Sequence, residues 1–71
     1  MTNWTSTNAY TTRGYVLKNN KGYTFQVNLY GGGYEVRILK PDSTLENVYE
    51  RLASWDLARI LNDWQVEATP Q

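Results

Sequence analysis

The chain has 71 residues, contains no cysteine and no histidine, and balances seven basic residues with seven acidic ones. This length allows one domain with a thin core. The composition excludes disulfide cross-links, zinc sites built on cysteine or histidine, and catalysis by a thiol or an imidazole, so the three Trp, six Tyr and one Phe must supply much of the core.

The N-terminal residues 1–9 are rich in threonine and asparagine, with Trp4 as their large apolar residue. This composition predicts a loose arm, and residues 68–71 are expected to form a C-terminal tail. The single domain is then expected over residues 10–67. No signal peptide and no apolar stretch of the roughly 20 residues that cross a bilayer can be identified. With no cysteine present, these features predict a cytoplasmic protein without a membrane partner.

Three β-strands are predicted in the first part of this domain. Residues 11–18 are rich in β-formers, and residues 19–22 suit a hairpin turn closed by glycine. The clearest strand covers residues 23–30, where apolar and polar side chains alternate strictly. Three glycines at residues 31–33 then reverse the chain, and the alternation returns over residues 34–40 before a proline-containing turn.

Residues 45–53 fit two structures. Leu45, Val48, Tyr49 and Leu52 fall at helical spacing behind a capping pattern formed by Ser43 and Glu46. On one continuous helix, however, Leu45, Val48 and Leu52 would lie roughly 120° from the apolar residues of the next segment, so both sets could not be buried on one face. A strand over residues 46–53 is therefore favoured, and two helices or one kinked helix are the alternative.

A helix is predicted over residues 55–67. Ser54 is expected to be its N-cap, and Asp56 places an acidic side chain in its first turn. The elements together predict an α+β fold, an antiparallel β-meander of three or four strands with one C-terminal α-helix packed on one face. The predicted core consists of Phe25, Val27, Val36, Ile38, Leu57, Ile60, Leu61 and Trp64. Because ten rings exceed what this arrangement can bury, a homodimer is also expected.

No catalytic, metal or cofactor site is predicted, and the chain is expected not to be an enzyme. Asp56 and Arg59, three residues apart on the predicted helix, are expected to form a surface ion pair. Asp56 and Asp63 lie on a solvated face, which argues against a cation site. The glycines of residues 31–33 join two strands, so no helix N-terminus is available there to bind phosphate.

A protein-binding module is the favoured function of the chain. A neutral domain dense in tyrosine and tryptophan is typical of protein-binding modules. The composition also suits a small adaptor or inhibitor of a larger partner, of the kind that phages and mobile elements encode. The residues predicted to contact a partner are Gln26, Asn28, Tyr30, Arg37, Tyr49 and Trp55.

The alternative is a nucleic-acid-binding domain that uses the sheet face left uncovered by the helix. Residues 1–40 carry five basic residues against one acidic residue, a net charge of +4, and residues 41–71 carry two against six, a net charge of −4. Packing of a basic half against an acidic half explains this asymmetry without a partner. The nucleic-acid interpretation requires the five basic residues to share one face, namely Arg13, Lys18, Lys21, Arg37 and Lys40.

Overall fold

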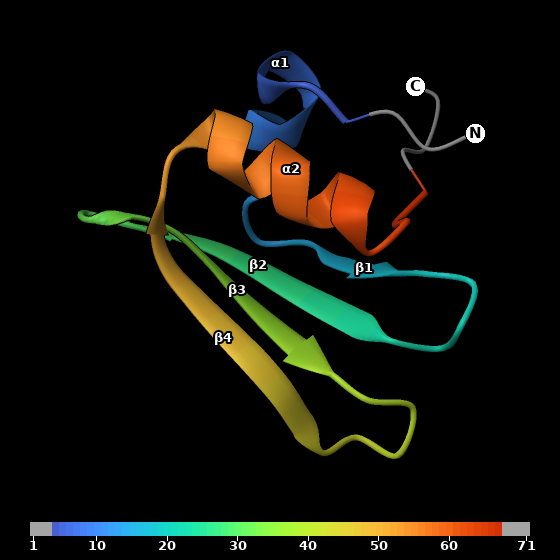
Figure 1. The fold of residues 1–71 in the computed structure, drawn as a ribbon. Coiled ribbons are helices and arrows are strands. Elements are labelled where there is room, and N and C mark those ends of the chain that lie inside the picture. The colour runs from blue at the N-terminus through green and yellow to red at the C-terminus, as the bar shows by residue number, and fades with distance from the viewer. Residues whose placement is uncertain (1–3, 68–71) are drawn as a thin grey trace.

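A computed structural model describes residues 4–67 of the chain, so residues 1–3 of the expected arm and the expected tail over residues 68–71 lie outside it. One helix, α2 (Ser54–Asp63), crosses one face of a four-stranded antiparallel sheet, and the short helix α1 (Ser6–Ala9) packs against α2 (Figure 1). The predicted α+β meander with a C-terminal helix is confirmed. In chain order the elements are α1 (Ser6–Ala9), a 3-10 turn (Tyr10–Thr12), β1 (Val16–Lys18), β2 (Thr24–Tyr30), β3 (Gly33–Leu39), β4 (Leu45–Leu52) and α2 (Ser54–Asp63), and the strand order is β1-β2-β3-β4.

The ambiguous segment forms the strand β4, not a helix. Ser43, the first residue of the alternative capping pattern, lies in the preceding turn with a φ of 74°. The residues that fell at helical spacing divide between the two sheet faces, because Tyr49 and Leu52 pack against the core whereas Val48 pairs with Arg37. Two register shifts interrupt the ladder between β3 and β4. Such bulges displace the alternation of side chains, which explains why β4 shows no strict period of two in the sequence.

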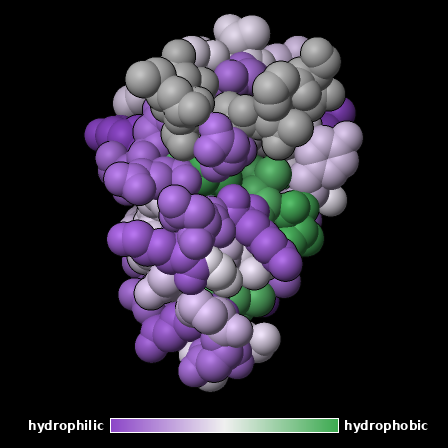
Figure 2. Space-filling view, turned by 90° about the vertical axis from the view of Figure 1, so that its right-hand side faces the viewer, coloured by the Kyte–Doolittle hydropathy of each residue, from purple (hydrophilic) through white to green (hydrophobic). Residues whose placement is uncertain are grey.

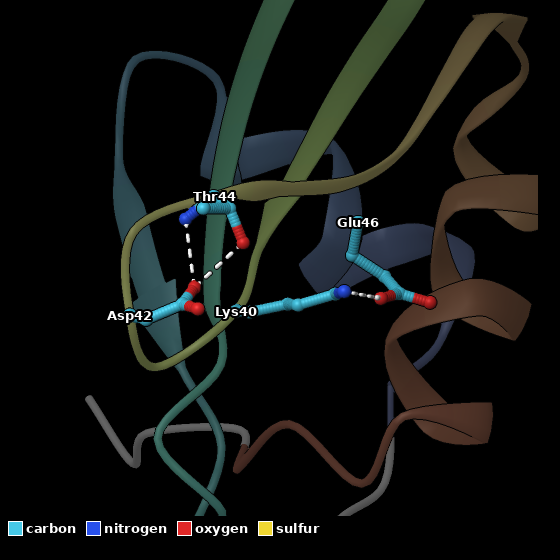
Figure 3. A network of polar contacts seen from close by, with 4 residues as sticks. All are labelled: Lys40, Asp42, Thr44 and Glu46. Atoms are coloured by element: carbon cyan, nitrogen blue, oxygen red, sulfur yellow. Dashed lines mark hydrogen bonds and ion pairs between the residues drawn. The ribbon is translucent and has the colours of Figure 1, made fainter.

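The turn between β3 and β4 is closed by a small polar network (Figure 3). The carboxylate of Asp42 accepts hydrogen bonds from the hydroxyl of Thr44 at 2.6 Å and from the backbone N–H of Thr44 at 3.0 Å. Beside it, Nζ of Lys40 lies 3.7 Å from Oε1 of Glu46. The two bonds from Thr44 stabilise the ionised carboxylate and hold the pKa of Asp42 below its ordinary value.

Replacing Thr44 with valine is expected to raise the pKa of Asp42 towards its ordinary value, because the hydroxyl donor is lost. Since the folded-state pKa is the lower one, the contribution of Asp42 to stability is complete above the ordinary carboxyl pKa. It is lost as the pH falls through the lowered value. An NMR titration of the Asp42 carboxyl carbon in both proteins measures this shift. An unchanged pKa would show that the hydroxyl does not hold the carboxylate.

The core lies between the sheet and α2. Ile60 and Trp64 are only half-buried, and the Trp64 ring lies against Tyr23 and Phe25 at centroid distances of 5.2 and 5.8 Å. Leu29 lies on the core side of β2, opposite Tyr34, but is 41% exposed because the end of the hairpin extends past α2 (Figure 1). The largest fully buried side chains are Phe25, Val27, Val36, Ile38, Leu57, Leu61 and Val66, six of which belong to the predicted core.

Residues 4–9 are an integral part of the domain, not a loose arm. Trp4 is 7% exposed, and its indole N–H donates to the carbonyl oxygen of Val66 at 2.7 Å. The side-chain amide of Asn62 accepts from the backbone N–H of Trp4 at 2.7 Å and donates to its carbonyl oxygen at 2.9 Å. Reciprocal hydrogen bonds between Thr5 and Asn8 then form a capping box that starts α1. Trp4 therefore attaches this otherwise polar segment to the domain.

The first predicted strand is shorter than expected. Gly14 has a φ of 80°, which turns the chain before β1 and restricts the strand to its last three residues. The backbone N–H of Gly14 nevertheless donates to the carbonyl oxygen of Val27 at 2.7 Å. The segment before β1 thus stays attached to the sheet without being part of a strand.

The helix α2 also begins and ends earlier than predicted. Ala53, instead of Ser54, is the N-cap. At the other end, the N–H of Val66 donates to the carbonyl oxygen of Leu61 at 2.9 Å, the hydrogen bond that defines a Schellman motif. Gln65 takes the left-handed φ of 57° that glycine usually adopts there. Because the sequence lacks this glycine, it contains no signal for the helix end.

No helix within residues 4–67 has the length and apolar character needed to cross a bilayer.

Candidate functional site

The sheet face opposite α2 carries no helix within the described residues, and we call it the open face (Figure 1). Residues directly opposite one another in antiparallel strands point to the same face. The register therefore places two rows of side chains across all four strands. One row consists of Val16, Gln26, Arg37 and Val48, and the next consists of Lys18, Thr24, Leu39 and Leu45.

The open face exposes large apolar side chains around a polar centre. Val16 on β1 is 60% exposed, Leu45 on β4 is 55% exposed, and Tyr30 at the end of β2 is 60% exposed. Gln26 and Asn28 are half-buried between them. Single exposed apolar residues are ordinary on protein surfaces. Several on one face, together with an arginine, resemble the composition of protein contact surfaces.

The structure brings together four of the six predicted contact residues. All four lie on β2 and β3 and point to the open face, and they are Gln26, Asn28, Tyr30 and Arg37. The apolar contribution of β4 to this face, from Leu45 and Val48, was not predicted, because the favoured strand over residues 46–53 had no predicted register against its neighbour. The paired-strand register is the signal that places them.

The other two predicted contact residues lie elsewhere. Tyr49 packs against the core, and its hydroxyl accepts a hydrogen bond from the side-chain amide of Asn47 at 3.1 Å. Trp55 is 62% exposed in the first turn of α2, with the guanidinium carbon of Arg59 5.5 Å from the ring centroid. Arg59 also forms the predicted ion pair with Asp56. These residues do not extend the open face.

Glu35 lies on the open face, opposite Asn28, but is only 9% exposed. Its Oε1 lies 3.5 Å from Nε of Arg37, close enough for an ion pair. This oxygen is nevertheless buried without a hydrogen-bond donor among the described residues. The sequence contains no sign of this burial, because alternating charges on a strand are usually both solvated.

A pocket of about 280 Å³ opens beside Glu35 at the β2–β3 end of the open face. It is lined by Tyr30, Gly32, Gly33, Glu35, Glu50 and Arg51. The predicted hairpin turn at the glycine run is confirmed, and Gly33 has a further role in it. Its φ is 125°, and a Cβ atom at this position would lie 2.9 Å from the carbonyl oxygen of Leu52. Only glycine therefore allows β3 to start this close to the end of β4.

The basic side chains do not form one uncompensated surface. Two of the five, Arg37 and Lys40, each lie beside a glutamate, at 3.5 and 3.7 Å respectively. Figure 2 views the end of the sheet that carries the β1–β2 and β3–β4 turns, and shows it covered mainly by hydrophilic residues. The apolar side chains of this view are confined to a narrow band. This end of the molecule thus differs in character from the open face.

Among residues 4–67, no group of three or more histidine, cysteine, aspartate or glutamate side chains is arranged to hold a metal ion. Comparisons with protein-family models, with curated proteins and with solved structures found no match to this chain.

Proposed function

We propose that this chain is a non-catalytic protein-interaction module, an adaptor or an inhibitor of a larger protein, that contacts its partner through the open face. The observation that carries the proposal is the exposure of Val16, Tyr30 and Leu45 around Gln26 and Arg37 on one face of the sheet. Aromatic residues and arginine are enriched in protein interfaces and contribute much of the binding energy. The expected cytoplasmic location and the phage or mobile-element origin remain part of this proposal.

A second copy of the chain is one protein that this face could bind. Exposed apolar side chains on the open face would be buried in such a homodimer, which would add to the stability of a small core. A homodimer is therefore one case of the proposed protein binding, because it would use the same surface.

Nucleic acid binding is less well supported as an alternative. A sheet that reads DNA or RNA needs an excess of basic side chains. Arg37, at the centre of the open face, is instead paired with a buried carboxylate, and the chain has no net charge.

Replacing Tyr30 with alanine is expected to weaken partner binding by about 2 kcal/mol or more, whereas Trp55→Ala should leave it nearly unchanged. The two side chains are matched controls, because both are aromatic and similarly exposed but only Tyr30 lies on the open face. Capture of partners from the native host by each variant, with and without nuclease, measures the difference. Sedimentation of the purified chain at high micromolar concentration shows whether the partner is a second copy.

Two results would overturn the proposal. Loss of the captured protein with Trp55→Ala but not with Tyr30→Ala would move the interface to α2. Capture that disappears with nuclease, together with salt-sensitive binding of labelled DNA or RNA, would establish the nucleic-acid alternative.

A further inference from the structure

The carboxylate of Glu35 is the most unusual polar group on the open face. Its Oε1 is sealed from solvent without a hydrogen-bond donor in residues 4–67, and the nearby Arg37 is positioned for an ion pair but not for a hydrogen bond. A buried carboxylate oxygen without a donor is costly, because it has given up its bonds to water. Glu35 also lines the pocket at this end of the open face.

A second carboxylate and an aromatic ring lie on the walls of this pocket. Glu50, on β4, forms no ion pair within the described part of the chain, and Tyr30 is 60% exposed. Gly32 and Gly33 contribute no side chains, which leaves the space of about 280 Å³ open between the walls.

This combination suits a guanidinium group. A planar guanidinium donates several hydrogen bonds to carboxylates and stacks on aromatic rings, whereas an ammonium ion acts as a compact point charge. A neutral group of the same shape would gain neither the charge-assisted bonds to Glu35 and Glu50 nor the cation–π contact with Tyr30.

We propose that this pocket receives an arginine side chain of the partner protein, held by Glu35 and Glu50 against the ring of Tyr30. The proposal rests on the proposed function, because it identifies the chemistry by which a protein would dock on the open face. Arg51, also on the wall of the pocket, opposes the ligand by like-charge repulsion and limits its affinity.

The test uses the purified, isotope-labelled chain and N-acetyl-arginine amide as the probe, at low salt. Amide NMR signals of Gly32, Gly33 and Glu35 are expected to shift in a saturable, salt-sensitive way. N-acetyl-citrulline amide, which has a similar shape without the charge, is expected to bind about tenfold more weakly or not at all.

Four variants separate the pocket from general electrostatic attraction. Glu35→Gln and Glu50→Gln should each weaken the binding of the arginine probe several-fold, and Arg51→Gln should strengthen it. Glu46→Gln is the matched control, because Glu46 is also on β4 but is paired with Lys40 outside the pocket. Glu50 is exposed, so its variant reports on binding even if the change at buried Glu35 disturbs folding.

Equal affinity for the arginine and citrulline probes would overturn the proposal, and so would tighter binding of N-acetyl-aspartate amide. Unchanged binding of the arginine probe by both Glu35→Gln and Glu50→Gln would also overturn it. None of these results would affect docking on the open face, which is judged separately by the loss of the captured protein with Tyr30→Ala.

Discussion

Truncating Leu61 to alanine is expected to destabilise the domain by about 2–5 kcal/mol. Leu61 lies on the face of α2 that packs against the sheet, and its side chain is fully buried. Truncating this side chain leaves a cavity that the surrounding backbone cannot close without distorting both layers. Small domains have a total stability of roughly 5–15 kcal/mol, so this single change removes a large share. Urea unfolding monitored by circular dichroism measures the difference in the free energy of unfolding.

Ile60→Ala is the matched comparison for Leu61→Ala. Ile60 is the neighbouring residue on the same helix and loses a similar number of methyl groups, but it is only half-buried. Its truncation should cost clearly less than that of Leu61. Equal costs, or a cost below about 1 kcal/mol for Leu61, would contradict the described packing of α2 on the sheet.

Replacing Trp4 with alanine is expected to cost about 3–5 kcal/mol, the range for large aromatic residues in cores. The change removes a side chain that is 7% exposed, and it leaves the carbonyl oxygen of Val66 without its hydrogen-bond donor. It also weakens the packing of α1 against α2. If residues 4–9 formed a loose arm, the substitution would not measurably change the free energy of unfolding. Urea unfolding therefore distinguishes an anchored segment from a loose one.

Trp4→Phe separates the ring from its hydrogen bond. Phenylalanine retains most of the buried apolar area but leaves the carbonyl oxygen of Val66 without its donor at 2.7 Å, at a cost of about 1–3 kcal/mol. A variant as unstable as Trp4→Ala would show that the hydrogen bond, not the ring, is the anchor. A variant as stable as the parent chain would assign the whole effect to the ring.

The fold was predictable where local pattern and tertiary structure agree. The alternation at Phe25 and Val27, the glycine run and the stripe of Leu57 and Leu61 all lie where their periodicity placed them. The errors came from residues whose partners are distant in sequence. Trp4 depends on hydrogen bonds to residues 58 and 62 positions away, which no local pattern contains.

The candidate site was predictable in position but not in composition. The period of two on β2 and β3 identified the face that carries Gln26 and Arg37. The contribution of β4 depends on two register shifts, so the position of Val48 opposite Arg37 follows only from the paired strands. Burial of Glu35 likewise depends on how the β2–β3 turn and the end of β4 come together, which is a property of the assembled sheet.

The contact between Trp4 and Val66 also has a consequence for the order of events on the ribosome. The three hairpin pairings of the sheet join segments that are close in sequence and can form as they emerge. Trp4 is synthesised before its partner Val66, which lies 62 residues later in the chain. At a synthesis rate of roughly 5–20 residues per second, the indole waits for about 3–12 seconds before its native site exists. Residues 4–9 can therefore take their native position only after α2 and Val66 have been made, so their docking is a late step of folding during synthesis.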